Sequence, residues 1–161
     1  MQVMKRSRRA AREIALNILY QCDSSHIPFD EALETALEYT DLSEMESKSP
    51  GKAEEARSHA RALAVGVRDH LEEIDARISD LAVGWPLDRQ PAVDRNILRI
   101  AIYEINYMDS VPSIVAVDEA VELAKKYSTA ESGKFVNGVL AGYLREKENN
   151  REAEEVDSKD S

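Results

Sequence analysis

Apolar residues recur along most of the chain at spacings of three and four residues, the period of an α-helix with one buried face. No segment gives a convincing β-strand, so the pattern predicts an all-α protein. The clearest apolar stripe lies near the N-terminus and consists of Ala11, Ile14, Ala15, Ile18, Leu19 and Cys22.

The spacing and the turn residues between segments predict seven helices. The helix near residues 91–105 is apolar around most of its circumference, so we expect it to be central, with Arg95, Arg99 and Glu104 paired inside the protein. Thirty residues is long for one globular helix, which predicts that 53–82 breaks into two near residues 72–75. The predicted helical segments are 5–22, 28–37, 53–82 (two helices), 91–105, 111–126 and 134–144.

Three segments lack apolar periodicity. Residues 1–9 form a basic arm, and the acidic, Ser-rich stretch 40–52 is predicted to be a mobile loop. Residues 145–161 are charged and are predicted to be a disordered tail. This leaves residues 1–144 as a single helical domain.

The composition supports one domain in a reducing compartment. The chain has 161 residues, of which 43% are hydrophobic, enough for one substantial core. Its single cysteine excludes an intramolecular disulfide, and no apolar stretch approaches the length of a membrane span. The sequence therefore predicts a soluble, cytoplasmic protein.

The charge is distributed unevenly. The formal net charge is −10, yet residues 1–13 carry five Lys or Arg side chains and one acid, a local charge of +4. An acidic protein repels polyanions at long range, so a nucleic acid would have to bind a local basic patch in a salt-sensitive manner.

Such a patch is predicted on the first helix. At roughly 100° per residue, Lys5, Arg9, Arg12, Leu16 and Tyr20 fall within about 80° of one another, beside the apolar stripe. Cations neutralise phosphates and an aromatic ring stacks on an unpaired base, so this edge suits single-stranded RNA. The alternative is structural, since basic N-termini are common and the tyrosine could complete the core.

A second candidate lies at the start of the last predicted helix, in residues 131–138. A helix N-terminus offers free backbone amides, Lys134 adds charge, Asn137 can bond a base edge and Phe135 can stack if it is exposed. The structural alternative is that Phe135 belongs to the core and that Gly138 permits close helix packing.

Catalytic chemistry is not indicated. The three histidines have no metal-ligand spacing with the cysteine, and the chain has no Gly-rich phosphate loop or nucleophile elbow. We therefore expect no enzyme activity and no metal or cofactor.

Several blocks, in order along the chain, resemble the NusB family of transcription antitermination factors. The blocks are Arg8–Glu13 with Leu19–Tyr20, Trp85–Arg89, Asp94–Glu104, Asp118–Tyr127 and Phe135–Leu140. The resemblance implies a fold of seven helices in two packed subdomains. It also implies binding to the boxA element of ribosomal RNA operon leaders together with NusE, a small-subunit ribosomal protein, and action on RNA polymerase with other Nus factors.

The resemblance also implies which residues bind. The family's arginine-rich motif falls on Arg8, Arg9 and Arg12, with Tyr20 further along the helix, and Tyr20 and Asp94 lie where NusE would be met. The second RNA-contacting region falls on four residues: Glu131, Lys134, Phe135 and Asn137. The chain departs from the family where Ala10 and Ala11 interrupt the arginines, and in the acidic loop and tail.

Two other functions remain open at this point. Some ribosomal RNA cytosine methyltransferases carry a NusB-like N-terminal domain. A helical scaffold that binds basic proteins through its acidic surface is an alternative of another class. The sequence does not distinguish a monomer from a homodimer.

Overall fold

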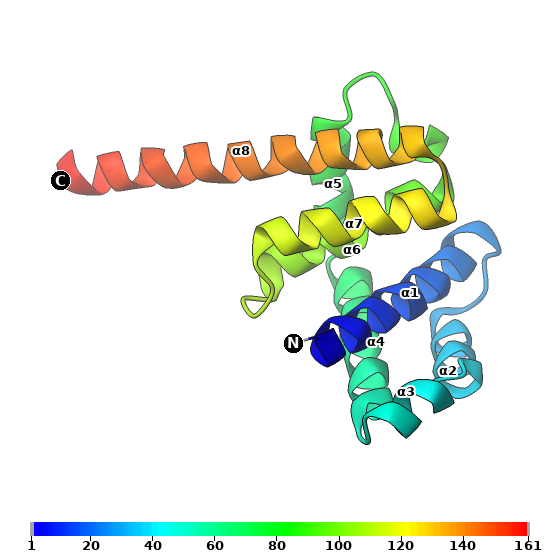
Figure 1. Ribbon diagram of the computed structural model, residues 1–161. Coiled ribbons are helices and arrows are strands. Elements are labelled where there is room, and N and C mark those ends of the chain that lie inside the picture. The colour runs from blue at the N-terminus through cyan, green and yellow to red at the C-terminus, as the bar shows by residue number, and fades with distance from the viewer. Residues whose placement is uncertain (1, 161) are drawn as a thin grey trace.

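A computed structural model describes residues 2–160 of the chain and the side chains of residues 6–159. Met1, Ser161 and the side chain of Lys5, which belong to the predicted arm, tail and basic edge, lie outside this part. Residues 2–160 contain eight α-helices, one short 3-10 helix and no strand, so the all-α prediction is confirmed (Figure 1). The elements are α1 (Gln2–Ser24), α2 (Phe29–Tyr39), α3 (Ser43–Lys48), α4 (Lys52–Asp69), α5 (Leu71–Leu81), η1 (Leu87–Arg89), α6 (Ala92–Tyr107), α7 (Ser113–Tyr127) and α8 (Ala130–Asp160).

The additional helix is α3, which lies in the segment predicted to be a mobile loop. Asp41 accepts hydrogen bonds from the backbone N–H and hydroxyl of Ser43, and Glu46 accepts the N–H groups of Gly51 and Ala53 at the start of α4. Leu42 is buried in the core. The acids therefore order this segment through local side chain to backbone bonds, which a search for apolar periodicity does not detect.

The predicted break in the long helical segment is present, although it lies at His70 instead of residues 72–75. α4 ends at Asp69 and α5 begins at Leu71, while the N–H of His70 bonds the carbonyls of Gly66 and Val67. The ring of His70 stacks on that of Tyr107 with centroids 4.2 Å apart. This contact with α6 is consistent with a turn at that residue.

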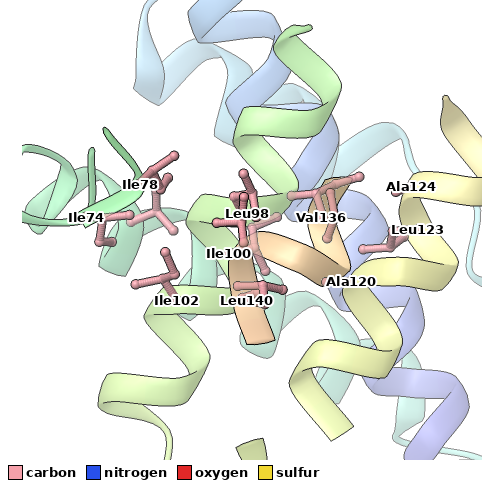
Figure 2. Packing of buried hydrophobic residues seen from close by; sticks show 14 of the residues in the cluster. Ile74, Ile78, Leu98, Ile100, Ile102, Ala120, Leu123, Ala124, Val136 and Leu140 are labelled. Carbon is pink, nitrogen blue, oxygen red and sulfur yellow. The ribbon is translucent and has the colours of Figure 1, made fainter. Parts of the chain in front are cut away.

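Two hydrophobic clusters form the core, as expected for two packed subdomains. One joins α1, α2 and α4 with Leu42, and the other joins α1 and α4 to α5, α6, α7 and α8. Figure 2 shows side chains of α5, α6, α7 and α8 meeting in the larger cluster, with Leu98 and Ile100 of α6 near its centre. α1 and α4 contribute to both clusters, so the helix that carries the basic edge is also the link between the two halves.

Arg95 and Arg99 of α6 are paired with acids of other helices, as predicted. Arg95 and Arg99 both bond the carboxylate of Asp23 at the end of α1, and Arg99 also bonds Asp75 of α5. Burial acts to raise the pKa of Asp23, but hydrogen bonds from Arg95 and Asn96 and the positive charge of Arg99 hold this pKa below its ordinary value. The carboxylate thus stays ionised and joins α1 to α6, while Arg99 extends the connection to α5.

The last helix continues where the sequence predicts a disordered tail. α8 runs to Asp160, and Figure 1 shows its C-terminal half projecting from the body of the protein. The segment contains no Gly or Pro after Gly142, and Arg151 pairs with Glu148 one turn away. The side chains of residues 147–159 are exposed, so this half adds nothing to the core.

Candidate nucleic-acid interface

The basic edge of α1 lies against α7. Arg9 of α1 bonds Glu119 of α7, and Lys126 of α7 bonds Glu13 of α1 at 2.7 Å. A hollow of about 200 Å³ lies between them, lined also by Arg12. We call the surface formed by Arg9, Glu13 and Lys126, with Arg12 and Glu119 beneath it, the α1–α7 seam.

Arg9 is partly exposed and held by a carboxylate. Its Nε lies 2.9 Å and its Nη2 3.1 Å from the two carboxylate oxygens of Glu119. The hydrogen bond to Glu119 raises the pKa of Arg9. The side chain of Arg9 is 49% exposed and that of Glu119 only 8% exposed, so the cation is on the surface and the acid is beneath it.

Arg12 differs from the prediction, because it is buried. Its Nε and Nη2 donate to the two oxygens of Glu104 on α6 at 2.7 and 2.8 Å, and its side chain is 4% exposed. The helical wheel assigned Arg12 to the exposed edge, but an acid from another helix draws it inward. In this structure Arg12 holds α1 on α6 and is not on the surface.

Arg8 is half-buried and lies on the other side of the seam. It lines a hollow of about 280 Å³ together with Pro112, Val115 and Asp118 near the start of α7. Arg8 and Arg9 therefore flank the first half of α7, and both can be reached from solvent.

The second predicted region is built around the start of α8. The hydroxyl oxygen of Thr129 accepts the N–H of Ser132, which caps the helix, and the hydroxyl of Ser132 donates to Asp94 at 2.9 Å. Asp94 is completely buried, so it cannot contact a partner directly in this structure. Its observed contact ties the first turn of α6 to the first turn of α8.

The remaining residues of this region differ in exposure. Glu131 and Lys134 are exposed and pair with each other at 3.3 Å, and Asn137 is exposed one turn further on. Phe135 is half-buried against the larger core cluster, as its structural alternative predicted. A Cβ added at Gly138 would have no atom within 4 Å, so this glycine does not serve close packing.

Trp85 was not among the predicted site residues, but it lies against one of them. Its ring packs on Phe135 with centroids 4.5 Å apart, and the residue is 39% exposed. The tryptophan therefore presents an accessible ring beside Phe135. Only the motif around Trp85 signalled its position, since 50 residues separate the two rings.

Lys126 and Tyr127 were not among the predicted site residues either. They end α7 and are separated from the start of α8 by two residues, Ser128 and Thr129. Lys126 bonds Glu13, its ammonium lies 5.2 Å from the centre of the Tyr127 ring, and both residues are exposed. On α1, Tyr20 is 38% exposed.

Arg8 and Arg9 therefore lie at the seam. Lys126 and Tyr127, at the end of α7, precede α8, the helix that carries Lys134. Arg12 and Asp94 lie beneath this surface. Among the side chains that the structure describes, no group of three His, Cys, Asp or Glu could hold a metal ion.

Comparison with known proteins gives a consistent match. The model of the NusB family matches residues 9–145. The transcription antitermination protein NusB of Symbiobacterium thermophilum is 45% identical over 154 residues, which cover 96% of this chain and 99% of that protein.

Two solved structures are similar in fold and sequence. T. maritima NusB has a TM-score of 0.72 and 34% identity, with 86% of this chain and 91% of that chain covered. A structure of the antitermination factors NusB and NusE in complex with double-stranded RNA contains a chain with a TM-score of 0.70 and 31% identity, covering 85% of this chain and 95% of that one.

Proposed function

Since this chain belongs to the NusB family, we propose that it is a transcription antitermination factor that binds boxA-type single-stranded RNA of ribosomal RNA operon leaders together with NusE. It works in the cytoplasm on the RNA polymerase elongation complex, with other Nus factors, and it catalyses no reaction. The observation that carries the proposal is the 45% identity to a NusB protein over almost the whole of both chains.

The RNA runs along the α1–α7 seam to the start of α8. Phosphates are bound by Arg8, Arg9 and Lys134, which are accessible cations on this surface. Lys126 adds a fourth cation between them.

Bases are bound by rings and by one amide. Tyr20 and Trp85 offer accessible rings, and Phe135 supports the ring of Trp85 from below. Asn137 is exposed and can hydrogen-bond a base edge.

Arg12 and Asp94 have a positioning role. Arg12 fixes α1 on α6 through Glu104, and Asp94 fixes the start of α8 through Ser132. NusE would meet Tyr20 directly, while Asp94 would act on NusE or RNA through the helix start that it holds.

The comparisons favour this function over its alternatives. A scaffold that binds only proteins does not account for family membership over residues 9–145. Three NusB proteins are matched over 92 to 99% of their own length. This match favours a NusB protein over the NusB-like domain of a methyltransferase.

A fluorescence anisotropy titration with boxA RNA tests the function. We expect the chain to bind boxA RNA more tightly than a scrambled strand, and NusE to raise the affinity for boxA by a coupling of about 1 to 3 kcal/mol. A duplex of the same sequence belongs in the comparison, because a related NusB–NusE pair has been solved with double-stranded RNA. Equal affinity for boxA and scrambled RNA, with NusE present, would contradict the proposal.

The variant Arg9→Ala tests the path of the RNA. We expect it to weaken boxA and scrambled RNA by the same factor of roughly five, about 1 kcal/mol for one phosphate contact, and to flatten the salt dependence of binding. Arg151→Ala on the projecting half of α8 makes the same change in net charge away from the seam and should have little effect. If both variants weaken binding alike, Arg9 does not contact the RNA.

A further inference from the structure

We propose that Glu119 competes with RNA phosphates for Arg9 and thereby sets the strength with which this protein holds any RNA strand. The inference rests on the proposed RNA-binding function. It concerns a residue of α7 that lies outside both of the predicted RNA-binding regions.

The contact between the two side chains has the geometry of a phosphate contact. Nε and Nη2 of Arg9 face the two oxygens of Glu119 at 2.9 and 3.1 Å. A guanidinium binds phosphate oxygens with this same pair of donors. A phosphate that binds Arg9 through Nε and Nη2 must therefore displace Glu119.

The carboxylate is held in place, whereas the guanidinium can move. Glu119 is 6% exposed. Its second ion-pair partner, after Arg9, is Arg12, whose Nη1 lies 3.9 Å from a carboxylate oxygen of Glu119. Arg12 is itself fixed by Glu104. When RNA arrives, Arg9 turns outward and Glu119 remains beneath the seam, next to the cation of Arg12.

The carboxylate therefore affects RNA binding in two ways. Separating Arg9 from Glu119 costs free energy, and the negative charge left behind repels the incoming strand. Both effects act on phosphates, which are the same in every RNA sequence. Glu119 should lower the affinity for all strands by one common factor and leave the preference for boxA unchanged.

The variant Glu119→Gln tests the inference in the full chain with NusE at a fixed, saturating concentration. Its side chain has nearly the same shape, and the thermal unfolding midpoint checks that the fold is kept. We expect its affinity for both boxA and scrambled RNA to rise roughly two- to fivefold, the range for one partly exposed ion pair. The salt dependence should become steeper for both strands.

Glu122→Gln is the matched control. Glu122 lies on the same helix, lines the same hollow and carries the same charge, but its ion-pair partner is Lys125, at 3.7 Å. This variant reports the effect of removing one negative charge near the RNA without releasing Arg9. The rise for Glu119→Gln must exceed the rise for Glu122→Gln.

A double-mutant cycle supplies the decisive comparison. In the Arg9→Ala background, Glu119→Gln should raise affinity no more than Glu122→Gln does, because there is no guanidinium left to release. An excess that persists without Arg9, an affinity that falls, or a rise equal to that of Glu122→Gln would each overturn the inference.

The same titrations separate the inference from the function on which it rests. If the unmodified chain prefers boxA but Glu119→Gln shows no excess, only the role of Glu119 is refuted. If the unmodified chain binds boxA and scrambled RNA equally, the proposed function fails, and the inference fails with it.

Discussion

Replacing Glu104 by alanine is expected to lower the free energy of unfolding by about 3 to 5 kcal/mol, the cost of leaving a buried charge without its partner. The side chains of Glu104 and Arg12 are 1% and 4% exposed, and two short hydrogen bonds join them. Without Glu104, the nearest ion-pair partner of Arg12 is Glu119, at 3.9 Å. Urea denaturation of the two proteins measures the difference.

Two further variants identify the cause. Glu44→Ala removes a carboxylate whose pair with Lys48 is exposed, and it should leave stability nearly unchanged. Replacing both buried partners, Arg12→Met with Glu104→Leu, removes the two charges together and should recover most of the loss. A loss for Glu104→Ala no larger than that for Glu44→Ala would contradict the buried pair.

Gly66→Ala is expected to destabilise the protein by about 1 to 3 kcal/mol through overpacking. A methyl group at this position of α4 would lie 2.0 Å from Cζ and 2.4 Å from Oη of Tyr103 on α6. The ring of Tyr103 cannot shift freely, because it stacks on Tyr107 with centroids 5.2 Å apart. The same urea denaturation measures this loss.

Gly138→Ala is the matched control for this substitution. Gly138 also lies within a helix, but the space around it is open, so alanine should stabilise α8 by about 0.5 to 1 kcal/mol. Opposite signs for the two variants would show that helix propensity acts at Gly138 and close packing at Gly66. If Gly66→Ala were as stable as the unmodified protein, the close approach of α4 and α6 would be refuted.

Most of the helices could be predicted from the sequence, because each of them buries one apolar face whose residues recur every three to four positions. α6 shows this most clearly, since Ile97, Leu98 and Ile102 are all fully buried. The short helix α3 could not be predicted in this way, because it is ordered by hydrogen bonds that Asp41 and Glu46 accept and not by an apolar stripe. The projecting half of α8 likewise has helix-forming residues without an apolar face.

The site was predictable only as far as one helix could show it. The wheel of α1 located Arg9 and Tyr20 on an exposed edge, and both are accessible. It also assigned Arg12 to that edge, because the acid that draws Arg12 inward lies 92 residues later in the chain. Trp85 and Lys126 come from other parts of the chain, so the wheel of α1 could not place them beside the predicted residues.

The two residues of the Arg9–Glu119 pair are synthesised at different times. Arg9 and its carboxylate partner are separated by 110 positions, which the ribosome adds in roughly 5 to 20 s. During that interval Arg9 lacks this partner, because Glu119 is synthesised only with α7. The carboxylate that we propose limits RNA binding can therefore act on Arg9 only late in synthesis, once α7 has been made.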